Sequence, residues 1–114
     1  MKHMRIGELG EKIAVKHLLS LGYTLLSSNT KVAGVEIDIL AQKDKTIYIV
    51  EVKTSVFNKN FNSPLDRVVA QKIERLARAA DWYSREHDVI VSLLAVSVCI
   101  YTEEKRAECE LIEL

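Results

Sequence analysis

The sequence has little of the residues that interrupt or cross-link a chain. Only one of its 114 residues is proline, four are glycine and two are cysteine. It has no repeats or low-complexity tracts, and its length suits one compact domain over residues 1–114. Two cysteines without a visible secretory signal favour free thiols. A disulfide between Cys99 and Cys109 across a terminal hairpin stays open as the alternative.

An excess of either charge is also absent. The chain carries 16 basic and 16 acidic residues, so its formal net charge is zero. This balance argues against a histone-like protein that binds nucleic acids through bulk charge. The longest apolar stretch, residues 89–100, is too short to span a membrane and is interrupted by Ser92 and Ser97. We therefore expect a cytoplasmic protein with no membrane partner.

The charges are nevertheless unevenly placed. Between Lys53 and Ala80 the chain has six cations and two anions, whereas five acids and two bases follow from Glu103 onward. The middle of the chain could therefore face phosphate groups. The plainer alternative is a solvated helix flank.

Apolar spacing predicts two helices and five strands. One helix is expected from about Ile6 to Leu21, and a second from Ser63-Pro64 to about His87. Strands are expected at 23–28, 35–42, 46–54, 91–101 and 107–112. The order is α-β-β-β-α-β-β, with 35–42 and 46–54 as an antiparallel hairpin and the next strand returning parallel beside them. This is a mixed central sheet flanked by helices.

Three ionisable residues, Asp38, Glu51 and Lys53, stand inside strands that otherwise read as buried. Burying such groups is costly unless something compensates them. If Asp44-Lys45 is a two-residue turn, Asp38 lies directly opposite Glu51. Opposed like charges destabilise a sheet, so a cation or a proton is needed between them.

A hard cation such as Mg²⁺ suits this pair, because it binds one or two carboxylates together with water and phosphate oxygens. The carbonyl of Val52 could face the same ion. Lys53 could stabilise the developing pentavalent phosphate or help to lower the pKa of the attacking water. The alternative is structural: Glu36 pairs with Lys53 on an exposed face, and Asp38 and Glu51 reach water.

Four segments together carry a resemblance to a known family: Gly7-Glu8-Leu9-Gly10-Glu11, residues 35–40, Glu51-Val52-Lys53-Thr54 and Gln71-Lys72. The chain resembles, from about Ile6 to Tyr83, the small restriction-endonuclease-like family often called YraN. More widely it looks like the PD-(D/E)xK nuclease superfamily, and it is similar in size and layout to archaeal Holliday-junction resolvases.

The resemblance implies an α/β restriction-endonuclease-like fold with an α-β-β-β-α-β core and a metal-dependent nuclease site. It assigns site residues as follows: metal ligands Asp38 and Glu51, catalytic lysine Lys53, an extra acid Glu8 near the metal or Lys53, Gln71 at the rim, and Glu36 as an accessory acid.

The expected function is Mg²⁺-dependent hydrolysis of DNA phosphodiester bonds, with branched or otherwise structured DNA as a candidate substrate and Mn²⁺ as a substitute ion. DNA is favoured over RNA, and a homodimer is plausible by analogy with junction-cutting enzymes. The expected nucleic-acid contacts are Lys59, Arg67, Gln71, Lys72 and Arg75. Two alternatives remain: a non-catalytic nucleic-acid-binding module on the same fold, and a structural or partner-binding domain.

Overall fold

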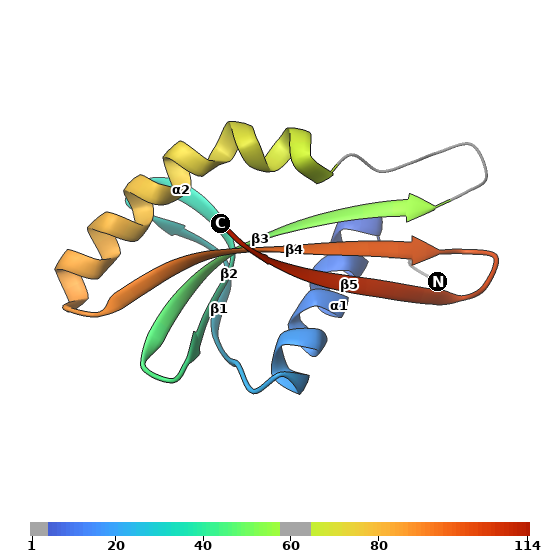
Figure 1. Cartoon of the computed structure of the whole chain (residues 1–114), viewed down its shortest axis with the longest axis horizontal. Helices are drawn as coiled ribbons and strands as arrows, with labels where there is room; N and C mark the ends of the chain where they lie inside the picture. The colour runs from blue at the N-terminus through green and yellow to red at the C-terminus, as the bar shows by residue number, and fades with distance from the viewer. Residues whose placement is uncertain (1–4, 58–64) are drawn as a thin grey trace.

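The computed structural model describes residues 5–57 and 65–114, with side chains from residue 72 onward in the second range. The elements follow the predicted order (Figure 1): α1 (Ile6–Ser20), β1 (Thr24–Val32), β2 (Val35–Lys43), β3 (Thr46–Phe57), α2 (Leu65–His87), β4 (Ile90–Tyr101) and β5 (Arg106–Glu113). The proposed helix start at Ser63-Pro64 lies outside the described residues. Residues 29–32, expected in a turn region, belong to β1 instead.

The five strands form one sheet in the order β1-β2-β3-β4-β5. β3 and β4 are parallel, and the other three neighbouring pairs are antiparallel. The predicted hairpin and the predicted parallel return after α2 are therefore both confirmed. The parallel pairing requires a crossover, which α2 supplies.

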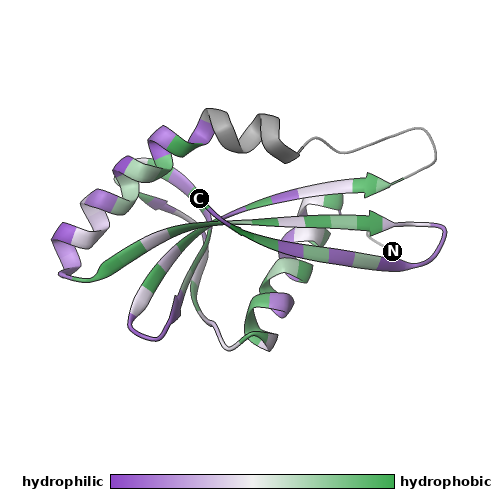
Figure 2. Cartoon of the chain, in the orientation of Figure 1, coloured by the Kyte–Doolittle hydropathy of each residue, from purple (hydrophilic) through white to green (hydrophobic). Residues whose placement is uncertain are grey.

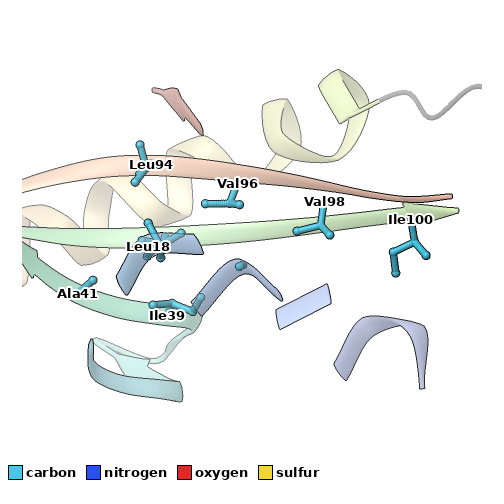
Figure 3. Close-up of a cluster of buried hydrophobic side chains, with 9 residues drawn as sticks. Leu18, Ile39, Ala41, Leu94, Val96, Val98 and Ile100 are labelled. Carbon is cyan, nitrogen blue, oxygen red and sulfur yellow. The ribbon is translucent and has the colours of Figure 1, made fainter. Parts of the chain in front are cut away.

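The two helices cover opposite faces of the sheet. Successive residues of β3 point to opposite faces: Val50 packs in a cluster with Ala14 of α1, and Ile49 packs in a cluster with Leu76 of α2. In Figure 3, Leu18 of α1 lies over apolar side chains from β2 and β4. Apolar residues occupy the central parts of the strands, while the turns between β2 and β3 and between β4 and β5 are hydrophilic (Figure 2). The alternation predicted from strand geometry thus builds a two-sided core.

The turn between β2 and β3 is the predicted two-residue Asp44-Lys45 turn. Both residues have positive φ, 50° and 66°, as a type I′ hairpin turn requires. The predicted register follows from Lys43 opposite Thr46 to Ile39 opposite Val50. The turn therefore sets which side chains of β2 and β3 can meet.

The alternative of a disulfide is wrong. Cys99 lies opposite Glu108, whereas Cys109 lies opposite Val98. Directly opposed residues of an antiparallel pair share a face, so the two thiols point to opposite faces of the sheet. Both cysteines are free, as the favoured prediction holds.

Neither helix in the described part of the chain combines the length and the apolar character needed to cross a membrane.

Candidate functional site

The regular pairing of the sheet is interrupted on both sides of Asp38. Pairing of β2 with β3 ends at Ile39 opposite Val50. Pairing with β1 passes from Ser28–Ile39 to Thr30–Ile37, and Asn29, on the skipped rung, has a positive φ of 50°. The register of β1 with β2 is the same on both sides of this rung, and its shift lies further away, between Leu25 and Ser27.

The Asp38 carboxylate replaces one of the missing backbone hydrogen bonds between β2 and β3. Its Oδ2 accepts a hydrogen bond from the backbone N–H of Val52 at 2.8 Å. The expectation of direct Asp38–Glu51 pairing is therefore wrong, because the strands separate one rung earlier. The carboxylate instead reaches across to β3 and lies beside Glu51 without being its paired neighbour.

Glu51 is the most deeply buried acid of the site, with only 4% of its surface exposed. One of its oxygens is 2.7 Å from the Nζ of Lys72 on α2. Burial raises the pKa of Glu51 and the Asp38 charge adds to this, while the hydrogen bond and the charge of Lys72 oppose it. The lysine stabilises a carboxylate that would otherwise be expensive to keep ionised in the sheet.

These groups surround a pocket of about 290 Å³ at the point where β2 and β3 separate. Four elements contribute to its lining, which consists of Ile6, Gly7, Glu11, Asp38, Glu51, Val52, Lys53, Thr54 and Lys72. The structure thus brings the predicted Asp38, Glu51, Val52 and Lys53 together. It adds a cation from α2, Lys72, which the sequence predicts only as a nucleic-acid contact.

The acid that α1 contributes to this pocket is Glu11, and not the predicted Glu8. Glu8 lines a different pocket, between α1 and strands β1 and β2, and Glu11 lines both pockets. Glu11 stands three residues before Ala14 and seven before Leu18, which are both buried, so it lies on the helix face that meets the sheet. That spacing was the available sequence signal, since side chains at i, i+3 and i+7 share a face.

Glu11 is also the site's clearest unsatisfied group. Among the described residues, its Oε1 is the buried side-chain oxygen or nitrogen atom that lacks a hydrogen-bond partner. Burial raises the pKa of Glu11, and the charges of Asp38, Glu8 and Glu51 raise it further. A buried acceptor without a donor costs free energy, which a cation would remove.

This donor set suits a hard divalent cation of the Mg²⁺ type. Asp38, Glu51 and Glu11 offer carboxylate oxygens, and the orphaned Oε1 of Glu11 points to a missing cation or donor. In the described part of the chain no three acidic, histidine or cysteine side chains form a ready-made cage. An open set with one or two direct carboxylates and several waters is what Mg²⁺ prefers.

The structural alternative for Glu36 is not found. The pairing of β2 with β3 ends at Ile39, so Glu36 has no paired residue on β3, and among the described residues it forms no ion pair with Lys53. It lines a neighbouring pocket together with Arg75, and Lys72 belongs to both pockets. Of the other predicted nucleic-acid contacts, Lys59 lies outside the described residues. Arg67 and Gln71 lie on α2, but their side chains are outside the described part.

The raised pKa values predict that the metal-free protein loses stability as the pH rises. For Glu11 and Glu51 the loss should begin near the ordinary glutamate value of 4.5 and continue through their raised folded-state values. The folded chain holds these protons more tightly than the unfolded chain, so unfolding releases protons and is favoured by higher pH. Urea unfolding in EDTA from pH 4.5 upward, compared between wild type and Glu11→Gln, measures the effect. A difference in unfolding free energy that does not vary with pH would contradict it.

A solved structure with a similar fold comes from a cyanobacterium. The fdxN element excision controlling factor protein of Anabaena variabilis superposes with a TM-score of 0.51, covering 91% of this chain and 98% of that chain at 14% identity. At this identity the likeness concerns the fold alone. The five-stranded mixed sheet flanked by helices is the predicted restriction-endonuclease-like α/β fold.

Sequence comparison gives the family. A UPF0102 protein of Flavobacterium psychrophilum is 35% identical over 112 residues, which are 98% of this chain and 93% of the relative. A UPF0102 protein of Dictyoglomus turgidum is 40% identical over 83 residues, 73% of this chain and 70% of the relative. The model of the family described as "Uncharacterised protein family UPF0102" matches residues 10–101. The chain, with its YraN-like motifs, therefore belongs to the UPF0102 family.

Proposed function

We propose that this protein is a metal-dependent endonuclease that hydrolyses DNA phosphodiester bonds. The observation that carries the proposal is the convergence of Glu11, Asp38 and Glu51 with Lys53 in one pocket, where the sheet pairing is interrupted. Acidic oxygens suited to a hard cation, next to a lysine, are the groups that phosphodiester hydrolysis requires. Branched or otherwise structured DNA is the substrate class that the resemblance favours.

Each residue has a distinct part in the proposed reaction. Asp38 and Glu51, with the Val52 carbonyl, would hold Mg²⁺ or Mn²⁺, and Glu11 would reach the ion through a bound water. The bound ion would supply positive charge to the phosphate and lower the pKa of a water molecule. Lys53 lines the same pocket, and its ammonium group would stabilise the charge that develops on the phosphate oxygens. Lys72, whose Nζ is 2.7 Å from Glu51, opposes the burial that raises the pKa of this acid.

The Asp38–Val52 hydrogen bond has a positioning part. It fixes one oxygen of the carboxylate and leaves the other for the pocket. The same bond holds the backbone between Glu51 and Lys53, so the acid and the lysine keep their relative positions. Preorganised groups of this kind cost little reorganisation during the reaction.

Cleavage assays test the proposal directly. Plasmid, single-stranded and four-way-junction DNA are incubated with Mg²⁺ or Mn²⁺, and Lys53→Ala serves as the matched variant. We expect metal-dependent cleavage by the wild type and a loss of roughly 100-fold or more with Lys53→Ala, because the variant removes charge stabilisation of the transition state. Activity that persists in EDTA, or that survives Lys53→Ala, would count against the proposal.

One observation favours a second candidate, a nucleic-acid-binding module without turnover. Lys72 already provides a counter-charge for Glu51, so that this acid is paired without a metal ion. Thermal melts separate the two candidates. Stabilisation by Mn²⁺ that is lost in Glu11→Gln supports the nuclease, whereas salt-sensitive binding of DNA without any metal effect supports the module.

A further inference from the structure

A second pocket adjoins the candidate active site and is lined by cations from two elements. It has a volume of about 310 Å³ and is lined by residues of α2 and of the β1–β2 hairpin. Its lining consists of Lys31, Gly34, Val35, Glu36, Lys72, Arg75 and Leu76. Three of these residues are cationic and one is acidic, so the pocket attracts anions.

The three cations reach the pocket from different directions. Lys72 and Arg75 are three residues apart on α2, so they share one face of that helix. Lys31 comes from β1, where it lies opposite Glu36 of β2. Within residues 5–57 and 72–114, neither Lys31 nor Arg75 takes part in an ion pair. Lys31 and Arg75 are therefore more available to bind an anion than Lys72, because Lys72 already contacts Glu51.

The pocket also has an uncrowded turn and apolar side chains in its lining. The turn Ala33-Gly34 forms one side, with positive φ at both residues, and a Cβ atom at Gly34 would meet no atom within 4 Å. The buried side chain of Leu76 also lines the pocket, and Val35 packs against the same cluster. Cations next to apolar side chains suit a sugar–phosphate unit, because such a unit has a charged phosphate and an apolar face on its sugar.

Lys72 connects this pocket with the candidate active site, since it lines both. We propose that the pocket of Lys31, Lys72 and Arg75 binds the backbone phosphate next to the scissile one on the same nucleic-acid strand. The strand would then run from Lys53, past Lys72, to the β1–β2 hairpin. The inference deepens the proposed function and rests on it for the location of the scissile phosphate.

This assignment gives Lys31 a specific role. It binds substrate but lies outside the pocket of Asp38 and Glu51, so it positions the strand without acting on the reacting atoms. Removing a contact of this kind weakens binding of the ground state and the transition state alike, which raises KM and leaves kcat unchanged. It also lowers the dependence of binding on salt, because one phosphate contact fewer releases fewer counter-ions.

The test uses the full chain and a labelled oligonucleotide. Binding is measured by fluorescence anisotropy in EDTA over a range of salt concentrations, and cleavage kinetics are measured with Mg²⁺. Lys31→Ala should weaken binding roughly threefold to tenfold and lower the salt slope by about 0.7 to 0.9. Lys16→Ala is the matched control, because Lys16 is an exposed lysine on α1, on the other side of the sheet. It should resemble the wild type.

Four outcomes are decisive. Equal binding and equal KM for Lys31→Ala and Lys16→Ala, in a wild type that cleaves DNA, overturn the inference and leave the proposed function standing. Weaker binding by Lys31→Ala in a wild type that does not cleave leaves a phosphate-binding pocket, but it overturns both the nuclease proposal and the assignment of the phosphate next to the scissile one. A 5′-mononucleotide that binds as tightly as the oligonucleotide overturns the inference, because no strand would then be needed. A wild type that binds no nucleic acid overturns it as well.

Discussion

Asp38→Asn is expected to lower the rate of metal-dependent DNA cleavage by at least about 100-fold while the fold remains in place. Loss of a residue that merely supports a metal ligand already costs about 10- to 100-fold in activity or metal affinity, and Asp38 would be a ligand itself. The fold should survive because the asparagine Oδ1 can still accept the N–H of Val52, the bond that measures 2.8 Å in the wild type. This one substitution therefore removes the negative charge of Asp38 while it keeps the hydrogen bond to Val52.

Two measurements check the Asp38→Asn prediction. Single-turnover cleavage gives the loss of rate, and thermal melts with and without Mn²⁺ give the loss of metal-dependent stabilisation. Asp44→Asn is the matched control, since Asp44 is an exposed acid in the turn that follows the same strand and lines neither this pocket nor that of Lys31 and Arg75. The control should keep the wild-type cleavage rate within a small factor. Full cleavage by Asp38→Asn would remove this carboxylate from the proposed metal site.

Gly10→Ala is expected to destabilise the protein by about 2 kcal/mol, despite the higher helix propensity of alanine. A Cβ atom at Gly10 would lie 1.7 Å from the Oγ1 of Thr54 and 2.7 Å from its Cβ. Rotation of the threonine cannot relieve the second contact, so α1 has to move away from β3. Because Glu11 follows directly, we expect the shift to carry this acid away from Asp38 and Glu51 and to weaken Mn²⁺ binding as well.

Gly7→Ala provides the matched control for Gly10→Ala. It adds the same methyl group to the same helix, but at Gly7 a Cβ atom would meet nothing within 4 Å. There the helix propensity should dominate, and the variant should be as stable as the wild type or more stable by up to about 1 kcal/mol. Thermal and urea unfolding measure both. If Gly10→Ala melts no lower than Gly7→Ala, the close approach of α1 to β3 is not a constraint.

The fold was largely predictable because its local signals agree with one another. Apolar spacing located α1 and α2, and the Asp44-Lys45 turn fixed the register from Lys43–Thr46 to Ile39–Val50. What failed was the extension of that register to Asp38. A regular ladder is the natural assumption for a strand, and nothing local in the sequence marks the rung at which β2 separates from β3.

The residues of the candidate site were also predictable only in part. Asp38, Glu51 and Lys53 stood out because charged residues inside apolar strands need compensation, and this is visible in the sequence. Glu11 and Glu8 are both acids near the start of one helix, and sequence motif alone favoured Glu8. The choice between them depends on how α1 is rotated against the sheet, which the close contact of Gly10 with Thr54 sets.

The sequence by itself determined the element order, the hairpin turn and the presence of buried acids, because each depends on residues close together in the chain. Only the tertiary structure decided which groups share a pocket. Lys72 is separated by 21 positions from Glu51, yet its Nζ is 2.7 Å from that carboxylate. Contacts of this kind arise from the packing of α2 on the sheet, and packing depends on the whole core and cannot be read from any single segment.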